Sequence, residues 1–156
     1  MAEKIVGAGI PVMGHIGLTP QTAQQLGGFK VQGKDAQSAK NIIEHAKALE
    51  QRGCFSIVLE CIPTQISKMI TEESSIATIG IGAGKECDGQ VLVTHDLLGL
   101  FDRYTPKFVK RYADVSTPIL EGIRNFCEEV ERGCFPDASH SYLMDQRELA
   151  NLEDGE

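Results

Sequence analysis

The sequence predicts an α/β protein in which about four parallel strands alternate with helices. Four short apolar runs, each of four to six residues, recur along the chain. Stretches with apolar residues at helical spacing separate the first three of these runs. The runs show little polar–apolar alternation, which is typical of parallel strands. Strands and helices in this order are joined by parallel crossovers.

The first two predicted strands flank a helix. We expect one strand over 10–13, ending just before His15, and a second over 55–59, ending just before Glu60. Between them, apolar residues repeat every three or four positions over 38–51 and predict an amphipathic helix. Each of the two titratable side chains therefore stands where an apolar run gives way to a turn.

The rest of the chain continues the α/β order. Pro63 suits the first turn of a helix that runs to about Glu73. Two further strands, joined by a turn, precede two more helices, and we expect one domain over 1–143 followed by a polar, flexible tail. The strands are expected over 76–81 and 90–94, the helices over 106–112 and 117–132, and the tail over 144–156.

Composition restricts the partners that the chain can have. A net charge of −7 gives no basic face for phosphates, which argues against a nucleic-acid partner. No apolar run approaches the roughly 20 residues of a membrane-spanning helix, and the N-terminus lacks the apolar core of a signal peptide. The five cysteines form no Cys-x-x-Cys pair, and their odd number favours reduced thiols over a disulfide framework. We therefore expect a cytoplasmic protein with no membrane partner.

Glu60 and His15 are the candidate site residues. Glu60 ends an apolar strand, where partial removal of water suits a general base, although a loop carboxylate stabilised by the following helix N-terminus explains the position equally simply. His15 can polarise a substrate oxygen or act as an acid or base, or it can merely hydrogen-bond within a strand-end turn. The carboxyl ends of parallel strands form the rim where α/β proteins bind ligands.

A glycine-rich stretch follows the third predicted strand. Gly80, Gly82 and Gly84 stand at alternate positions, so on one strand they share a face and allow a ligand or a neighbouring strand to approach closely. The dinucleotide-binding pattern is excluded because Lys85 stands where its third glycine is required. A non-enzymatic α/β module that holds an anion at this glycine-rich loop stays open as an alternative.

Several motifs, taken in order along residues 5–142, resemble one enzyme family. The resemblance is to ketopantoate hydroxymethyltransferase (3-methyl-2-oxobutanoate hydroxymethyltransferase), a folate-dependent enzyme of pantothenate biosynthesis, the route to coenzyme A. Seven motifs together are far more specific than any one alone. They are 14–21 (GHIGLTPQ), 27–33 (GGFKVQG), 58–63 (VLECIP), 79–84 (IGIGAG), 88–93 (DGQVLV), 106–110 (PKFVK) and 140–142 (HSY).

The resemblance implies a (β/α)8 TIM barrel, a fold that usually takes roughly 250 residues. The four predicted strands correspond to strands 5–8 of that barrel, so the sequence is expected to encode its C-terminal half without the N-terminal half. In the family, the metal ligands and the substrate-contacting Asp, Ser and Lys come from the missing half. Asp35, Asp88 and Asp96 do not match those motifs, and we therefore assign no metal ligand in this sequence.

The resemblance also implies a reaction. In the family, 5,10-methylenetetrahydrofolate gives its one-carbon unit to 3-methyl-2-oxobutanoate and forms 2-dehydropantoate, with Mg²⁺ binding the keto acid. Glu60 aligns with the family's proton acceptor, and His15 aligns with an active-site histidine near the substrate. The complete family enzyme is expected to be a homo-oligomer.

Two readings stand beside that of a working enzyme. A truncated, catalytically incomplete remnant would keep the family sequence without the metal and substrate ligands, and the anion-binding module would keep only the fold. Half of a barrel exposes two strand edges and apolar surface, so we expect the isolated chain to be unstable or to associate.

Overall fold

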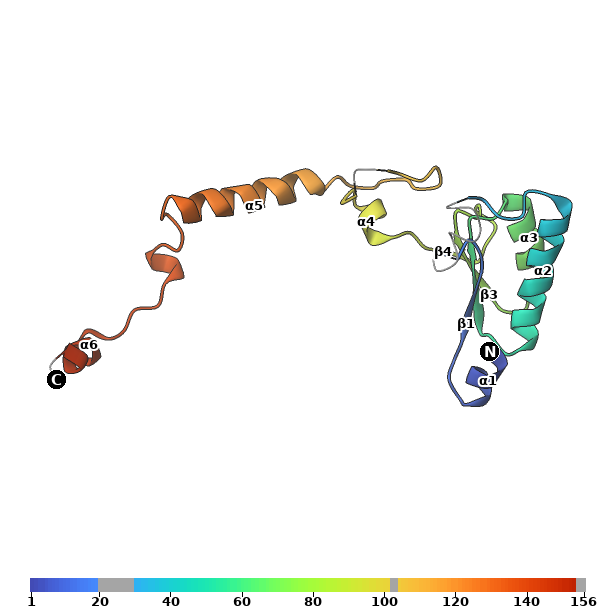
Figure 1. The fold of residues 1–156 in the computed structure, drawn as a ribbon, viewed down its shortest axis with the longest axis horizontal. Coiled ribbons are helices and arrows are strands. Elements are labelled where there is room, and N and C mark those ends of the chain that lie inside the picture. The colour runs from blue at the N-terminus through green and yellow to red at the C-terminus, as the bar shows by residue number, and fades with distance from the viewer. Residues whose placement is uncertain (20–29, 102–103, 154–156) are drawn as a thin grey trace.

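The computed structural model describes residues 1–19, 30–101 and 104–153. It contains a four-stranded sheet in which neighbouring strands are parallel and follow the chain order β1-β2-β3-β4 (Figure 1). This confirms the predicted α/β class with four parallel strands. The strands are β1 (Met13–Gly17), β2 (Ser56–Glu60), β3 (Ala77–Ile81) and β4 (Gly89–Gln90).

Two helices, α2 and α3, cover one face of the sheet (Figure 1). The side chain of Asp35 caps α2 by accepting hydrogen bonds from the backbone N–H groups of Gln37 and Ser38. Among the described helices, none is long and apolar enough to cross a membrane. The helices are α1 (Ala2–Gly7), α2 (Ala36–Gln51), α3 (Thr64–Glu73), α4 (Thr94–Leu97), α5 (Ser116–Glu131) and α6 (Gln146–Glu153), with a 3-10 turn η2 (Ala138–His140).

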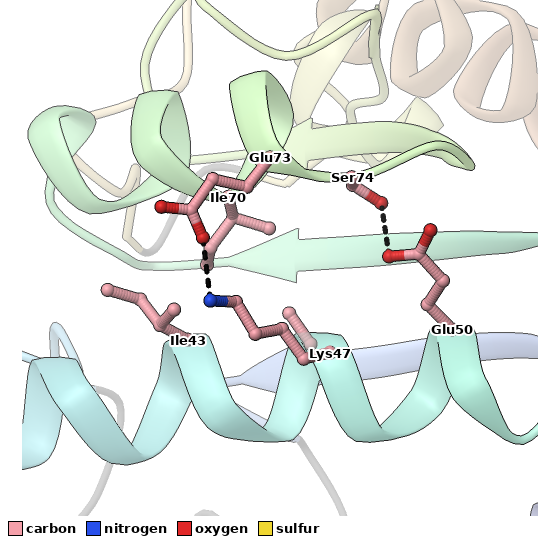
Figure 2. Close-up of a pocket in the computed structure, with 7 residues that line it drawn as sticks. Ile43, Lys47, Glu50, Ile70, Glu73 and Ser74 are labelled. Atoms are coloured by element: carbon pink, nitrogen blue, oxygen red, sulfur yellow. Dashed lines mark hydrogen bonds and ion pairs between the residues drawn. The ribbon is translucent and has the colours of Figure 1, made fainter.

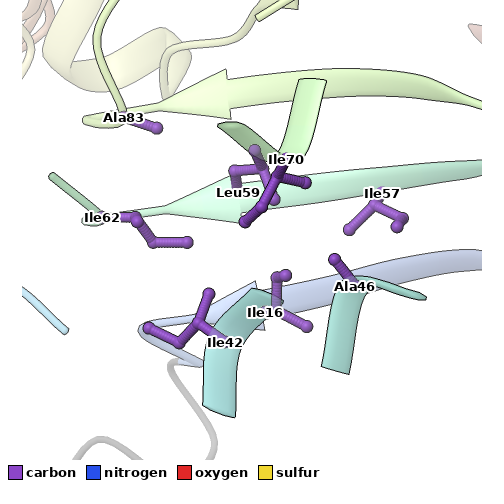
Figure 3. Close-up of a cluster of buried hydrophobic side chains, with 8 residues drawn as sticks. All are labelled: Ile16, Ile42, Ala46, Ile57, Leu59, Ile62, Ile70 and Ala83. Atoms are coloured by element: carbon purple, nitrogen blue, oxygen red, sulfur yellow. The ribbon is translucent and has the colours of Figure 1, made fainter. Parts of the chain in front are cut away.

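The core lies between the sheet and these two helices (Figure 3). Ile57 and Leu59 of β2 are fully buried there, and successive side chains of a strand point to opposite faces. Val58 and Glu60 therefore point to the other face of the sheet, away from α2 and α3. The buried cluster comprises Ile16, Ile42, Ala46, Ile57, Leu59, Ile62, Ile70 and Ala83.

The first strand begins and ends later than predicted. The prediction of a strand over 10–13 is wrong in its bounds, because β1 begins at Met13 and continues to Gly17. Pro11 has no backbone N–H to donate, so it cannot extend the hydrogen-bonded ladder as other residues do. His15 consequently lies inside β1, and Glu60 is likewise the last residue of β2 rather than the first residue after it.

Two predictions in the second half of the chain are wrong. The fourth strand is limited to Gly89–Gln90, and the helix α4 occupies Thr94–Leu97, where the predicted strand 90–94 ends. In place of the helix predicted over 106–112 there is a turn, in which the Val109 N–H donates to the Pro106 carbonyl at 2.9 Å. The Phe108 ring in this turn packs against Gly82 beyond β3, a tertiary contact that local periodicity does not encode.

The helix predicted over 117–132 is confirmed as α5, and among the described residues its Phe126 ring contacts Phe135 just beyond its end, with ring centroids 5.5 Å apart. The helix extends away from the sheet, and α6, within the predicted tail, lies farther from the sheet still (Figure 1). None of the α5 residues is buried. Its exposed apolar side chains nevertheless recur at helical spacing, which is typical of a helix with one packed face. They are Ile119, Leu120, Ile123, Phe126 and Val130.

A carboxylate connects α2 to the segment before β3 (Figure 2). Glu50 Oε1 accepts a hydrogen bond from the Ser75 backbone N–H at 2.9 Å, and Oε2 accepts one from Ser74 Oγ at 3.3 Å. Nearby, Lys47 Nζ and Glu73 Oε2 form an ion pair across the two helices at 2.8 Å. The hydrogen bonds from Ser75 lower the pKa of Glu50.

Replacing Glu50 by glutamine is expected to lower the free energy of unfolding by about 1 kcal/mol at pH 7, because charge-assisted hydrogen bonds weaken. The pKa of Glu50 is lowered in the folded chain. The stabilisation is therefore fully present above about pH 4.3, the ordinary glutamate pKa, and disappears as pH falls through the folded-state value. Urea unfolding at pH 7 and pH 3 measures this, with Glu44→Gln on α2 as the control. If the wild type exceeds Glu50→Gln in free energy of unfolding by the same amount at both pH values, the predicted pH dependence is wrong.

Candidate active site at the carboxyl ends of the strands

The carboxyl ends of three strands meet at one edge of the sheet. In the parallel register, Gly17 of β1 stands opposite Glu60 of β2, and Glu60 stands opposite Ile81 of β3. This is the edge at which parallel α/β proteins carry their ligand-binding residues. The strand ends therefore define where a site is expected.

Glu60 and His15 are in direct contact. The Nε2 atom of His15 lies 2.9 Å from Oε2 of Glu60. In the register, His15 stands opposite Val58, so it is the diagonal neighbour of Glu60 on the same face of the sheet. The Glu60 side chain is 14% exposed and that of His15 is 35% exposed. An ionised Glu60 accepts a hydrogen bond from Nε2–H, and this bond fixes the orientation of its carboxylate.

Glycine is required beside Glu60. Gly17 has φ +90°, and a Cβ atom built there would lie 2.1 Å from the Glu60 carbonyl oxygen. The same carbonyl accepts a hydrogen bond from the Leu18 N–H at 2.9 Å. The close approach of β1 to the end of β2 thus depends on a residue without a side chain, and it brings His15 within reach of the carboxylate.

Cys61 follows Glu60 in a left-handed conformation, with φ +51°. Burial and the neighbouring Glu60 carboxylate raise the pKa of the Cys61 thiol, so the sulfur keeps its proton at neutral pH. All five cysteines of the chain are free, in agreement with the prediction of reduced thiols. A protonated thiol is a weak nucleophile, so the raised pKa argues against a nucleophilic role for Cys61.

A cavity of about 370 Å³ lies on the other side of His15. This volume is in the range of small-molecule sites. His15 lines the cavity and also contacts Glu60, so it is shared between the cavity and the carboxylate. Further lining residues come from the segment after β1 and from α2; they include Gly17, Thr19, Gln32, Ser38, Asn41 and His45.

Two of the three aspartates considered from the sequence stabilise the fold. Asp35 caps α2, and Asp88 accepts hydrogen bonds from the backbone N–H and Oγ1–H of Thr78, which lower the pKa of Asp88. Within residues 1–19, 30–101 and 104–153, no three His, Cys, Asp or Glu side chains come together as a metal site.

The glycine-rich stretch is not one strand face, contrary to the prediction. β3 ends at Ile81, and Gly82 and Gly84 lie in the following loop with φ +66° and +83°. A Cβ atom on Gly82 would meet the Phe108 ring, and one on Gly84 would meet Thr64. Close packing of these side chains therefore explains why glycine is present at positions 82 and 84, and an anion-binding role is not needed to explain it.

Sequence reasoning found Glu60 and His15 but missed how they are connected. The contact depends on a strand register that places two residues 45 positions apart on one face. The left-handed Cys61 was missed as well, because only glycine and asparagine signal such a conformation reliably in a sequence. Residues 20–21 and 27–29 of the matching motifs lie outside the described residues.

A parallel sheet with a histidine and a carboxylate in contact at adjacent strand ends defines an α/β protein with a candidate site at those ends. The family model of ketopantoate hydroxymethyltransferase matches residues 1–138, and the chain belongs to this family. It is 55% identical over 155 residues to the 3-methyl-2-oxobutanoate hydroxymethyltransferase of Syntrophobacter fumaroxidans, covering 97% of this chain and 55% of that relative.

Two further relatives carry the same name. The protein of Oleidesulfovibrio alaskensis is 55% identical over 152 residues, covering 97% of this chain and 53% of its own length. That of Clostridium botulinum is 54% identical over 150 residues, covering 96% of this chain and 54% of its own length. The chain thus spans about half the length of the curated relatives it matches.

Proposed function

We propose that this chain contributes the proton-transfer residue to a 3-methyl-2-oxobutanoate hydroxymethyltransferase. The reaction transfers the one-carbon unit of 5,10-methylenetetrahydrofolate to 3-methyl-2-oxobutanoate and forms 2-dehydropantoate, in the cytoplasm. The 2.9 Å contact between His15 and Glu60 carries the proposal, because it holds a carboxylate in place where the reaction needs a base. Membership of the family and the names of the relatives support it.

Glu60 is proposed to accept a proton from C3 of the keto acid. Breaking this C–H bond leaves an electron pair that forms the new bond from C3 to the methylene carbon. Water supplies the hydroxyl group of the product, both C–N bonds of the methylene group break, and tetrahydrofolate leaves with a proton on each of the two nitrogens. Glu60 can then give up its proton to a leaving nitrogen, or exchange it at the new hydroxymethyl oxygen. Its side chain is 14% exposed, so the carboxylate can be reached by a substrate at the strand ends and is already held by His15.

His15 is proposed to have two contacts in the reaction. Its Nε2 atom holds the Glu60 carboxylate, and His15 is one of the residues that line the 370 Å³ cavity, whose volume accommodates a keto acid. A substrate oxygen near the strand ends would lie within reach of an imidazole that Glu60 already orients. The contact therefore couples substrate position to the position of the base.

The four strands are proposed to be the second half of a (β/α)8 barrel. The one-sided sheet supports this, since a barrel strand buries one face under helices and turns the other face inward. Mg²⁺ and the groups that bind it would be contributed by the part of the family fold that the described residues do not supply. The complete assembly is proposed to be a homo-oligomer.

Reconstitution tests this proposal. The purified chain is mixed with a polypeptide that contains the part of the Syntrophobacter fumaroxidans relative that this chain does not match. We expect 2-dehydropantoate to form in the mixture, with 3-methyl-2-oxobutanoate, methylenetetrahydrofolate and Mg²⁺ supplied. Product from the chain alone would contradict the placement of the metal ligands elsewhere. No product under either condition would favour a catalytically incomplete remnant.

A further inference from the structure

At the end of each of three neighbouring strands, one residue has a left-handed backbone conformation. β1 ends at Gly17 with φ +90°, while Cys61 with φ +51° follows β2 and Gly82 with φ +66° follows β3. Glycine adopts this conformation freely, whereas a residue with a Cβ atom adopts it at a cost in free energy. The costly residue is the one that directly follows Glu60. Strain of this kind concentrates at functional sites, where the surrounding structure must hold it.

Backbone hydrogen bonds hold Glu60 and Cys61 from three sides. The Leu18 N–H donates to the Glu60 carbonyl at 2.9 Å, and the Cys61 N–H donates to the Ile81 carbonyl at 2.9 Å. The Gln32 N–H donates to the Cys61 carbonyl at 2.8 Å. The end of β2 is therefore attached to both neighbouring strand ends and to the segment before α2.

The Cys61 side chain adds a fourth attachment. It is 9% exposed and forms a small buried cluster with Leu18, which is 2% exposed, separate from the core under α2 and α3. Leu18 directly follows β1, the strand that carries His15. The buried thiol thus packs against the segment that continues the His15 strand, and a glycine at position 61 would remove this packing.

We propose that Cys61 is a positioning residue, whose left-handed backbone and buried side chain hold the Glu60 carboxylate against His15. The contribution to catalysis rests on the role proposed above for Glu60. The positioning of Glu60 by Cys61 does not depend on that role, because the contact between Glu60 and His15 exists in the chain without substrate. The alternative is that Cys61 only fills space beside Leu18.

Histidine side-chain NMR on the full chain separates these alternatives. The Nε2 signal of ¹⁵N-labelled His15 is compared in wild type, Glu60→Gln and Cys61→Gly, with His45 and His95 as internal controls. We expect Cys61→Gly to move the His15 signal more than halfway towards its Glu60→Gln position and to leave both controls unchanged. Its melting temperature should change little, because relief of backbone strain offsets the lost packing. A wild-type His15 signal together with a lowered melting temperature would overturn the proposal.

Two further variants keep the test decisive. Cys61→Ser preserves the shape of the side chain and should leave the His15 signal in place, whereas a shift as large as that of Cys61→Gly would overturn the proposal. Should Cys61→Gly not fold, Cys61→Ala retains the Cβ atom and should shift the signal in the same direction by a smaller amount. An unshifted signal in Cys61→Ala would then count against positioning.

Turnover in the reconstituted mixture gives the catalytic readout. Cys61→Gly should lower kcat by roughly 10- to 100-fold with little change in KM, as expected when a reacting group is misplaced. Unchanged turnover in Cys61→Gly, with strongly reduced turnover in Glu60→Gln, would remove the catalytic part of the inference and leave the proposed function intact. Unchanged turnover in Glu60→Gln would overturn the proposed function, whatever the NMR result.

Discussion

Replacing Glu60 by glutamine is expected to lower the turnover of hydroxymethyl transfer by about 10²- to 10⁴-fold, the usual contribution of a positioned general base. Glutamine keeps the size of the side chain and can still accept a hydrogen bond from His15, but its amide cannot take the C3 proton. Steady-state product formation by the reconstituted mixture measures the loss. The fold should be preserved, because the Glu60 carboxylate contacts His15 at the rim and not the buried core.

Measuring the affinity for Mg²⁺ distinguishes whether Glu60 acts as a base or as a metal ligand. Titration calorimetry of the reconstituted mixture should give nearly the same Mg²⁺ affinity with the wild-type chain and with Glu60→Gln, because Glu60 is not assigned as a metal ligand. Glu72→Gln is a matched control, because Glu72 is an exposed carboxylate on α3 that pairs with Lys68 at 3.7 Å, away from the strand ends. Loss of Mg²⁺ binding in Glu60→Gln would contradict the role of a base.

The isolated chain is expected to self-associate, and α5 is expected to be the main contact. All of the large apolar side chains of α5 are exposed, Ile123 by 55% and Phe126 by 53%. A contiguous apolar stripe of this kind is typical of an interface rather than of a monomer surface. Burying one such side chain stabilises a complex by roughly 1.5–3 kcal/mol, so two lost anchors weaken association by more than tenfold.

Sedimentation velocity over a range of concentrations measures this association. The wild-type chain should sediment as a dimer or larger species, and the double variant Ile123→Asp/Phe126→Asp should shift strongly towards monomer. The control is Asn125→Asp, which adds a charge to α5 without removing an apolar side chain. A wild-type chain that stays monomeric at all concentrations would contradict the prediction, and so would an unchanged double variant.

The elements with strong periodicity were predictable from the sequence. The apolar spacing of α2 and α5 and the short, mainly apolar run of β3 predict these elements locally, and the structure confirms them. The segments around β4 and Phe108 were not predictable in the same way. Val91 and Val93 favour a strand by propensity, yet β4 pairs with β3 only at Gly89 and Gln90. The Phe108 turn exists because its ring packs on Gly82, a contact that follows from the fold and not from local sequence.

The site was predictable in its residues but not in its geometry. Glu60 and His15 stand out because each lies near the end of an apolar run, and the parallel fold brings strand ends together. Their contact further requires that β1 extend to Gly17 and pair in register with Glu60, and one residue of slippage would turn His15 to the other face. The left-handed Cys61 depends on three hydrogen bonds from distant segments, and no local sequence signal encodes these.

Hydrogen–deuterium exchange at C3 of 3-methyl-2-oxobutanoate tests the central claim most directly, because it isolates proton removal from one-carbon transfer. The keto acid is incubated in D₂O with Mg²⁺ and the reconstituted mixture, without folate, and the loss of the C3 proton is followed by ¹H NMR. We expect exchange with the wild-type chain and none above background with Glu60→Gln. Equal exchange rates with the two chains would show that another group removes the proton, and would contradict the role assigned to Glu60.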